Sequence, residues 1–182
     1  PRDPGPADDT YDVIVLGGGP AGENAAQYAV AGSDRTVALV EHELVGGECS
    51  YWACMPSKAL LRPAKVLATA RHVAGVGDKV SAHGVDVPAV LARRDGFTRH
   101  RDDTSQVDWA RSAGIDVVRG RGRLDGERAV AVTGARPDRP RILRARHAVV
   151  LATGTVAVVP DTPGLRAALP WTSRDATNLL EI

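Results

Sequence analysis

The sequence predicts an α/β fold with a parallel sheet and a small β-meander. The first observation is a strand–helix–strand pattern near the N-terminus, with apolar runs at Val13–Leu16 and Thr36–Val40 around a helix-forming stretch at Ala21–Ala31. Continuous apolar runs are typical of strands buried on both faces, and strands joined through a helix are parallel. The second observation is a series of short apolar segments from residue 115 to 152, interrupted by the turn signal Asp-Gly at 125–126.

The remaining elements follow in order along the chain. Helix formers predict helices at Pro56–Arg71, Asp86–Arg101 and Thr104–Ala113. The short strands expected after them are Ile115–Val118, Arg123–Leu124, Ala129–Thr133, Ile142–Arg144 and His147–Ala152. We therefore expect a flexible tail at residues 1–10, one domain at 11–160 and a connector at 161–182, where proline and glycine recur.

Composition excludes several classes of protein. Hydrophobic residues make up 43% of the 182 residues, charged residues 25%, and the net charge is +1. No apolar run is long enough to predict a membrane span, and the arginines between 119 and 146 have no aromatic residue among them to stack on bases. With only two cysteines a disulfide scaffold is excluded, so the sequence favours a cytoplasmic protein that binds neither membrane nor nucleic acid.

A glycine motif joins the first strand to the first helix. Gly17, Gly19 and Gly22 form G-x-G-x-x-G, and Glu41 ends the next strand. In such a turn the glycines allow a tight bend, close approach to a pyrophosphate and close helix packing, and the acidic residue accepts hydrogen bonds from a ribose. The motif predicts dinucleotide binding without deciding between FAD and NAD. The alternative is a turn that needs glycine for packing alone.

Both cysteines lie in the segment GGECSYWACMPSK, at Cys49 and Cys54. They could be unrelated buried thiols, half of a zinc site or a redox pair. A structural zinc site needs four ligands, and the chain has no second cysteine pair. On a straight helix residues five apart are roughly 8 to 9 Å apart, too far for a disulfide. If the two are bonded, Cys49 must therefore precede the helix or the first turn must be distorted. A helix N-terminus favours Cys54 as the thiolate, with Lys58 one turn on.

This segment resembles the active-site signature of the class I flavoprotein disulfide reductases. Their pattern is G-G-x-C, four residues, then C-x-P-S-K, and it follows an FAD fingerprint with an acidic ribose residue. The segment LATG at Leu151–Gly154 also fits, and the resemblance covers roughly residues 11 to 175. It implies a Rossmann-like FAD-binding domain that is incomplete relative to the three-domain family, because no second glycine fingerprint and no His-Pro pair are found.

The resemblance also implies roles for particular residues. Cys49 would attack the substrate, and Cys54 would lie against the flavin as a thiolate in a charge-transfer pair. No metal ligand is implied. The residues expected to bind FAD are Gly17, Gly19, Pro20, Ala21, Gly22, Glu41, Gly47, Glu48, Ser57, Lys58, Gly122, Thr153 and Gly154, with Gly122 at the adenine and Lys58 at the isoalloxazine.

The implied enzyme passes electrons from NAD(P)H through FAD to the Cys49–Cys54 disulfide, and on to a small-molecule or disulfide substrate. A homodimer is expected for the full-length protein, and we expect this chain to be its truncated, inactive N-terminal part. Glu48, Tyr51 and Trp52 depart from the residues usual in the family. A non-catalytic FAD- or NAD-binding module and a cysteine redox switch without flavin are the alternative interpretations.

Overall fold

The computed structural model describes residues 9–80, 84–134 and 140–180. The chain forms two compact units, one made of the residues up to Gly47 together with Asp102–Gly154, and the other of Glu48–Arg101 and the residues from Thr155 onward. Eight of the ten residues expected to form the N-terminal tail, 1–8, lie outside the described residues, and the first strand begins at Thr10.

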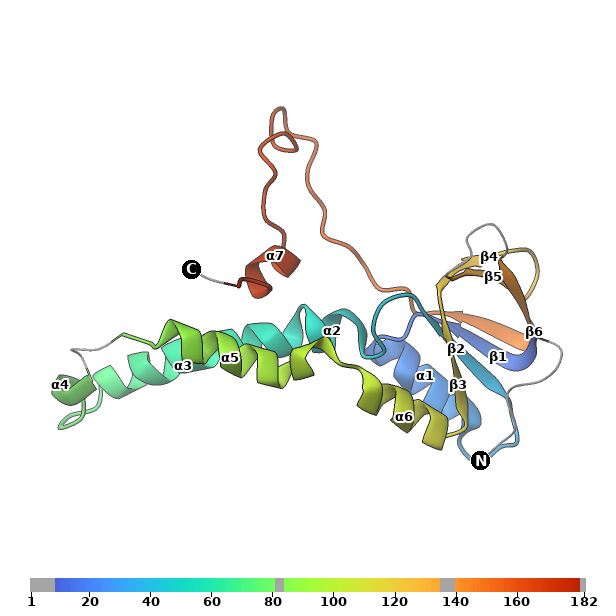
Figure 1. The fold of residues 1–182 in the computed structure, drawn as a ribbon, viewed down its shortest axis with the longest axis horizontal. Helices are drawn as coiled ribbons and strands as arrows, with labels where there is room; N and C mark the ends of the chain where they lie inside the picture. Colours follow the sequence, from blue (N-terminus) through green and yellow to red (C-terminus); the bar gives the residue numbers. More distant parts are fainter. Residues whose placement is uncertain (1–8, 81–83, 135–139, 181–182) are drawn as a thin grey trace. The chain divides into compact units, whose positions relative to one another are not determined.

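The first unit is built on one six-stranded sheet of order β3-β2-β1-β6-β5-β4 (Figure 1). Strand β1 pairs in parallel with β2 on one side and β6 on the other, and β2 pairs in parallel with β3. Strands β4, β5 and β6 are antiparallel and form the meander. The bounds of the six strands are Thr10–Leu16, Val37–Glu41, Ile115–Arg119, Arg121–Leu124, Ala129–Thr133 and Arg141–Leu151, from β1 to β6.

One face of the sheet packs against two helices. Helix α1 (Pro20–Val30) follows the glycine turn, and helix α6 (Thr104–Ser112) precedes β3. Alternate residues of β1 and β2, such as Val15 and Leu39, are fully buried against the small and apolar side chains of these helices, such as Ala26 and Val107. The period of two in the strands and the apolar side of each helix together define this half of the core.

The opposite face of β1 and β2 is covered by the meander. Ile14, Leu16 and Val40 form a second cluster with Val130 of β5 and Leu143 of β6. Because both faces are buried, β1 and β2 are apolar without alternation, as the sequence pattern indicated.

Strand β6 differs from the sequence prediction. The sequence suggested two strands, Ile142–Arg144 and His147–Ala152, whereas the chain forms the single strand β6 of eleven residues. The register with β1 shifts between Tyr11 and Val13, which pair with Ala145 and Ala148. A β-bulge therefore keeps the strand continuous through the polar residues that separated the two predicted pieces.

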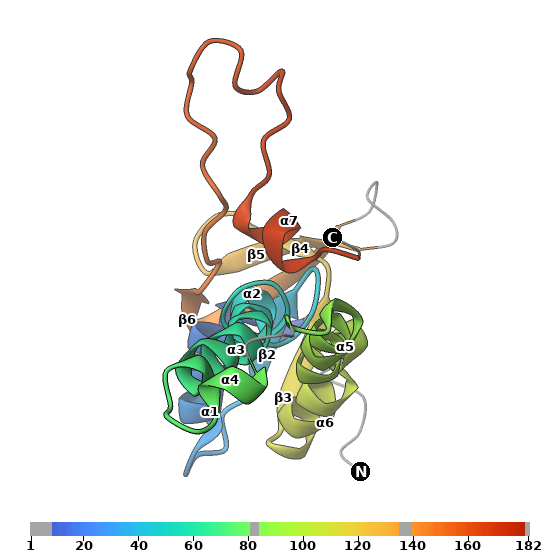
Figure 2. The same cartoon turned by 90° about the vertical axis from the view of Figure 1, so that its left-hand side faces the viewer.

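The second unit is helical. Helix α3 (Cys54–Arg71) packs along α5 (Val87–Phe97), and the two run side by side in Figures 1 and 2. A five-residue helix, α2 (Gly47–Tyr51), leads into α3, and the four-residue helix α4 (Gly77–Val80), which the sequence did not predict, follows it. No helix within the described residues is long and apolar enough to cross a membrane.

The helix predicted at Asp86–Arg101 is shorter than expected. Asp86 caps its start, where a carboxylate oxygen accepts a hydrogen bond from the Ala89 amide at 3.0 Å. The helix ends at Phe97 because the Thr98 hydroxyl donates to the Arg94 carbonyl at 3.1 Å, which satisfies a carbonyl of the last turn. The three residues of η1 (Arg99–Arg101) that follow have positive φ angles.

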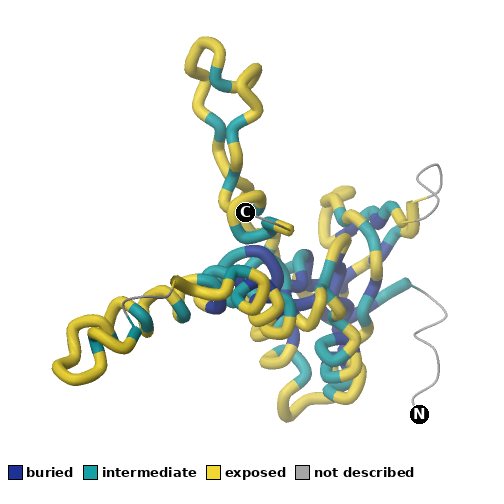
Figure 3. Tube along the Cα trace, turned by 60° about the vertical axis from the view of Figure 1, so that its left-hand side comes forward, coloured by how far each residue is buried: buried dark blue, intermediate teal, exposed yellow. Residues whose placement is uncertain are grey.

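The expected connector contains a further helix. Residues 155–172 contain no helix or strand, only turns at 163–168, and most of them are exposed (Figure 3). Helix α7 (Ser173–Thr177) follows and begins with a capping box between Thr172 and Asp175. This box holds the carboxylate of Asp175 in its charged form, since hydrogen bonds from the amide and hydroxyl of Thr172 lower the pKa of Asp175.

Candidate functional site

The glycine turn lies at the carboxyl end of β1, where the order of the parallel strands reverses. The Gly17 amide donates to the Val40 carbonyl of β2 at 2.9 Å, and the Ala152 amide after β6 donates to the Leu16 carbonyl at 2.8 Å. The chain leaves β1 toward one neighbour, β2, and reaches the other, β6, only much later. In open α/β sheets ligands bind in the crevice outside the carboxyl ends of the strands at this switch point.

Two glycines of the turn have no room for a side chain. A Cβ added to Gly17, where φ is +107°, would lie 2.2 Å from the Ala152 carbonyl oxygen. One added to Gly22 would lie 1.8 Å from the Gly17 carbonyl oxygen. Gly17 thus permits the turn, and Gly22 permits the close approach of α1 to the turn.

A second glycine segment crosses the turn. A Cβ on Gly47 would be 2.6 Å from the Gly19 Cα, and the Gly46 amide donates to the Gly18 carbonyl at 2.7 Å. Gly19 caps α1 without a side-chain hydrogen bond to the helix, and Pro20 is the first helical residue. The positive end of an eleven-residue helix at a glycine backbone fits a pyrophosphate, which needs no side chain to bind there.

Glu41 connects the second strand to the glycine turn. Its side chain is buried, and its two carboxylate oxygens accept hydrogen bonds from the Gly18 amide and the Glu43 amide, each at 2.7 Å. The His42 Nδ1 also lies 3.2 Å from Oε1. A carboxylate oxygen has a second lone pair, so Oε2 retains the capacity to accept a ribose hydroxyl. The geometry fits the ribose interaction expected from the sequence and adds a role that the sequence did not reveal, the anchoring of the turn.

The loop that follows Glu41 is held by two residues that sequence reasoning missed. The Asp103 carboxylate accepts from the Val45 amide at 2.7 Å and forms an ion pair with Arg119. Arg119 also donates to the Glu43 carbonyl at 2.6 Å. An isolated aspartate and an arginine at a strand end carry no motif, so only the fold brings them together.

The other predicted cofactor residues of the first unit lie at the ends or on the inner face of its strands. Thr153 and Gly154 follow β6 directly, and the Thr153 Cα is 3.1 Å from the Cβ position of Gly17. Gly122 lies in β4, where an added Cβ would be 2.1 Å from the Leu16 side chain. A side chain at Gly122 would therefore push the meander away from β1.

The two cysteines of the second unit contact each other. The chain breaks its helical path at Ala53 (φ −124°, ψ −89°), which separates Cys49 in α2 from Cys54 at the start of α3. The Trp52 and Ala53 amides both donate to the Glu48 carbonyl, at 2.9 and 2.7 Å. The break confirms the geometric expectation that Cys49 precedes the helix of Cys54, and it brings both thiols, which are free, into hydrogen-bonding contact.

The contact sets the protonation of Cys49. The hydrogen bond with Cys54 raises the pKa of the Cys49 thiol, and burial and the charge of a Cys54 thiolate raise it further, while Lys58 opposes them. Lys58 is exposed, and the Ser57 hydroxyl donates to the Cys54 carbonyl at 3.2 Å. The Cys49 sulfur therefore holds its proton more strongly than an ordinary cysteine does.

Glu48, which departs from the family pattern, is engaged within the second unit. The Arg174 guanidinium of α7 binds its carboxylate with two nitrogens, Nε at 2.9 Å and an Nη at 2.6 Å from Oε2. The same guanidinium lies over the Trp52 ring, 4.0 Å from its centroid. Sequence reasoning missed Arg174, which is separated from Glu48 by 126 positions.

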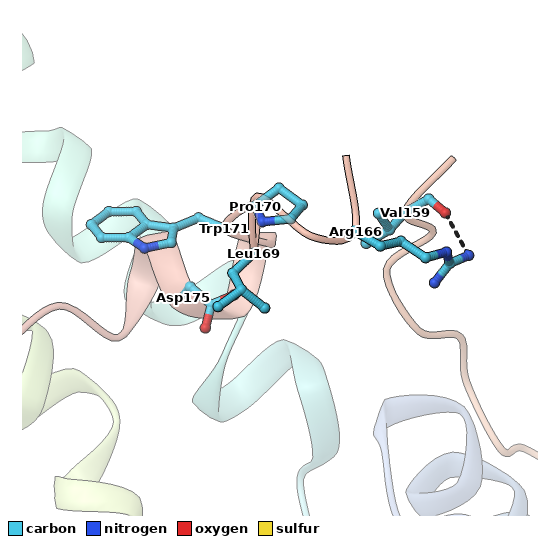
Figure 4. Close-up of a pocket in the computed structure, with 6 residues that line it drawn as sticks. All are labelled: Val159, Arg166, Leu169, Pro170, Trp171 and Asp175. Carbon is cyan, nitrogen blue, oxygen red and sulfur yellow. Dashed lines mark hydrogen bonds between the residues drawn. The ribbon is translucent and has the colours of Figure 1, made fainter. Parts of the chain in front are cut away.

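A pocket of about 380 Å³ also lies in the second unit, near α7 (Figure 4). Its lining includes Trp171 and Leu169, and its two charged groups are already bound within the chain. Arg166 donates to the Val159 carbonyl at 3.0 Å, and Asp175 belongs to the capping box. The pocket therefore offers no converging catalytic groups. Across the described residues, no three His, Cys, Asp or Glu side chains converge as metal ligands would.

The family model of the pyridine nucleotide-disulphide oxidoreductases matches residues 11–181. The chain belongs to this family. Its members are FAD-dependent oxidoreductases that use NAD(P)H, which agrees with the glycine turn and the cysteine segment of this member.

Curated relatives are similar along nearly the whole chain. A dihydrolipoyl dehydrogenase of Acholeplasma laidlawii is 35% identical over 93% of this chain and 49% of its own length. A mercuric reductase of Staphylococcus aureus is 28% identical over 96% of this chain and 30% of its own length. The chain thus spans between 30% and 49% of the length of these relatives.

A solved structure shows the same fold. The HOCl-induced flavoprotein disulfide reductase RclA of Escherichia coli, determined as its Cu(II) complex, superposes with a TM-score of 0.72 at 23% identity. The superposition covers 94% of this chain and 35% of that one. The Rossmann-like FAD-domain fold predicted from the sequence is confirmed.

Proposed function

We propose that this chain is the FAD-binding and dithiol part of an NAD(P)H-dependent disulfide reductase. The first unit would hold FAD, and Cys49 and Cys54 of the second unit would carry electrons to a small-molecule or disulfide substrate. The observation that carries the proposal is the direct contact of the two thiols across the break between α2 and α3. Two unrelated buried cysteines would need neither the contact nor the break.

The first unit supports the cofactor assignment through its backbone. Gly17, Gly19 and Gly22 leave the N-terminus of α1 open to a pyrophosphate, and Glu41 offers its Oε2 to a ribose. Pro20, Ala21, Gly47, Gly122, Thr153 and Gly154 are proposed to line the same cofactor, and Glu48, Ser57 and Lys58 to lie near its flavin. Bound FAD would supply the hydride chemistry that moves two electrons between NAD(P)H and the disulfide.

The dithiol can complete the exchange with a substrate disulfide. The Cys49 sulfur, once deprotonated, attacks one substrate sulfur, and the substrate S–S bond breaks to release one thiol. The Cys54 thiolate then attacks Cys49, which releases the second thiol and forms the Cys49–Cys54 bond. Two electrons have passed to the substrate, and the dithiol is oxidised.

The whole protein is proposed to act as a homodimer in the cytoplasm, as the resemblance and the composition indicate. The share of the relatives that this chain covers supports a reaction in which other segments supply the NAD(P)H site. By itself the chain is expected to bind FAD and to cycle its dithiol without turning over NAD(P)H.

The test is the visible absorption spectrum of the purified chain with FAD, recorded before and after anaerobic reduction with dithiothreitol. The proposal predicts a flavin spectrum that gains a long-wavelength thiolate charge-transfer band, and loss of that band in Cys54→Ala. Cys49→Ala is the matched control, because it keeps the sulfur that is expected to face the flavin.

Each alternative gives a different result. A chain that binds FAD but shows no band in either state is a non-catalytic binding module. A colourless chain that takes up no FAD, yet forms the Cys49–Cys54 disulfide, is a redox switch without flavin. Either outcome would replace the proposed function.

A further inference from the structure

Arg174 and Thr177 of helix α7 contact residues 48–54, here called the cysteine turn, through three interactions. Arg174 binds the Glu48 carboxylate next to Cys49 with two nitrogens. Its guanidinium also stacks on the Trp52 ring at 4.0 Å. The Thr177 hydroxyl donates to the Trp52 carbonyl at 2.7 Å. All three contacts end on the residues that form the break between α2 and α3.

The C-terminal end of α7 is hydrogen-bonded by a buried arginine of α5. The Arg94 side chain of α5 is 2% exposed, and it donates to the Thr177 carbonyl at 3.2 Å and to the Leu179 carbonyl. Arg94 also binds Asp95, with its Nε 2.9 Å from the carboxylate. A buried guanidinium that satisfies backbone carbonyls resists displacement, because those carbonyls would otherwise lose their partners. The segment from Arg174 to Leu179 is thus anchored on α5 while its side chains reach the cysteine turn.

The contacts act at the point that decides whether the sulfurs can meet. The Trp52 carbonyl and the Glu48 carbonyl both belong to the distorted turn that replaces a straight helix between Cys49 and Cys54. On a straight helix the two residues would be too far apart for a disulfide. The ties to Glu48 and Trp52 lie on the α2 side of the break, and α7 is itself anchored through Arg94 on α5, which packs along α3. The separation of the thiols is therefore limited from both sides.

Charge adds a second effect. Glu48 precedes Cys49 directly, and a free carboxylate there would disfavour the Cys49 thiolate. The bidentate pair with Arg174 compensates that charge, and the stacking on Trp52 fixes the plane of the guanidinium.

We propose that Arg174 and Thr177 of α7 are positioning residues for the Cys49–Cys54 pair, which hold the break that brings the sulfurs together and compensate the charge of Glu48. This inference rests on the proposed redox role of the two cysteines. It assigns a function to Glu48 and Trp52, which depart from the family pattern: both are binding partners of Arg174.

The test places the 182-residue chain in glutathione redox buffers. Oxidised glutathione takes up two electrons and two protons from the Cys49 and Cys54 thiols, so that two molecules of reduced glutathione leave as the protein disulfide forms. The measured quantity is the squared concentration of reduced glutathione divided by the concentration of oxidised glutathione at half oxidation, because two reduced molecules form from each oxidised one. Arg174→Gln is expected to shift this midpoint about fivefold in the direction that favours the dithiol. A shift of this size corresponds to the free energy that one partly exposed ion pair and one cation–π contact supply.

Three variants make the test specific. Arg166→Gln is the matched control, because this exposed arginine precedes α7 and donates to the Val159 carbonyl instead. The redox midpoint of this variant should equal that of the wild type. Arg174→Lys keeps the positive charge but loses the planar bidentate contact, so its redox midpoint should lie between those of the wild type and Arg174→Gln. Thr177→Val removes one hydrogen bond and should shift the midpoint about threefold in the same direction.

Alkylation of Cys49 by iodoacetamide separates charge from geometry. Arg174→Gln should slow it at pH 7.5 about threefold, because the Glu48 carboxylate is then uncompensated. Adding Glu48→Gln should restore the rate without restoring the redox midpoint. If α7 had a purely structural role, Glu48→Gln would not restore the alkylation rate. Nor would the alkylation rate and the redox midpoint respond differently to that change.

The outcomes are distinct. A wild-type chain that forms no intramolecular disulfide overturns the proposed function and this inference with it. A wild-type disulfide with an unchanged midpoint in both Arg174→Gln and Thr177→Val overturns the inference alone. If Arg174→Gln loses its far-ultraviolet circular dichroism, the comparison of Thr177→Val with Arg166→Gln decides.

Discussion

Replacing Gly22 with alanine should destabilise the chain although alanine is the better helix former. Gly22 lies in the first turn of α1, and the added Cβ would meet the Gly17 carbonyl oxygen at 1.8 Å, where ordinary contact begins at 3.4 Å. Gly17 or α1 must therefore shift by about 1.6 Å, the difference between these two values. Gly17 cannot move freely, since its amide is bonded to the Val40 carbonyl at 2.9 Å.

The magnitude follows from three contributions. Overpacking of this kind costs about 1–3 kcal/mol, and loss of the hydrogen bond to Val40 costs about 1 kcal/mol. Alanine returns about 0.5–1 kcal/mol through its helix propensity. We expect a net loss of about 2 kcal/mol in the free energy of unfolding, and a loss of FAD uptake because the turn opens.

Urea unfolding followed by circular dichroism measures the loss, and Gly96→Ala is the matched control. Gly96 also lies in a helix, α5, but its added Cβ would meet no atom within 4 Å. That variant should therefore gain about 0.5–1 kcal/mol from helix propensity. If Gly22→Ala were as stable as Gly96→Ala and bound FAD equally well, the close approach of α1 to the turn would not matter and the reasoning would be refuted.

Three further predictions concern single side chains. Cys54→Ala should lower the pKa of Cys49 by removing the hydrogen bond that raises it, and alkylation of Cys49 at pH 7.5 should accelerate; an unchanged rate would contradict the contact. Asp12→Asn should destabilise the chain at pH 7 and should destabilise it less near pH 3. The bonds from Thr36 lower the folded pKa of Asp12 below 3.8, so its stabilisation is present above that value and is lost as the pH falls through the folded pKa; equal losses at both pH values in thermal melts would exclude this. Arg94→Met should cost about 2 kcal/mol in urea unfolding, because the Thr177 and Leu179 carbonyls lose their donor, and a loss below 0.5 kcal/mol would show that α7 is held by other contacts.

Much of the fold could be predicted because local patterns and tertiary packing agree. The apolar runs at β1 and β2, the glycines of the turn and the helix formers of α1 each indicate the same βαβ unit. The meander was predicted from its Asp-Gly turn. The two errors, at β6 and α5, share a cause. A β-bulge and a side-chain hydroxyl that donates to a carbonyl of the last helical turn both leave little trace in the hydrophobic periodicity.

The candidate site was predictable only where a motif is contiguous. Gly17, Gly22 and the two cysteines belong to short motifs with fixed spacing. The ion pair of Glu48 with Arg174 joins residues 126 positions apart, and Asp103 reaches the Val45 amide across 58 positions. Such pairs form only through the tertiary fold, so no local stretch of sequence contains both partners.

The shared carboxylate of Glu41 has a consequence for any dissection of cofactor binding. The carboxylate that would meet a ribose already binds the Gly18 and Glu43 amides, so contacts on the adenosine side and on the pyrophosphate side would be thermodynamically coupled. Replacing Glu41 loosens the backbone that a diphosphate would contact, and the loss in affinity exceeds the value of the ribose contact alone. A double-mutant cycle with Gly22→Ala should therefore be strongly non-additive, with each change removing part of what the other depends on.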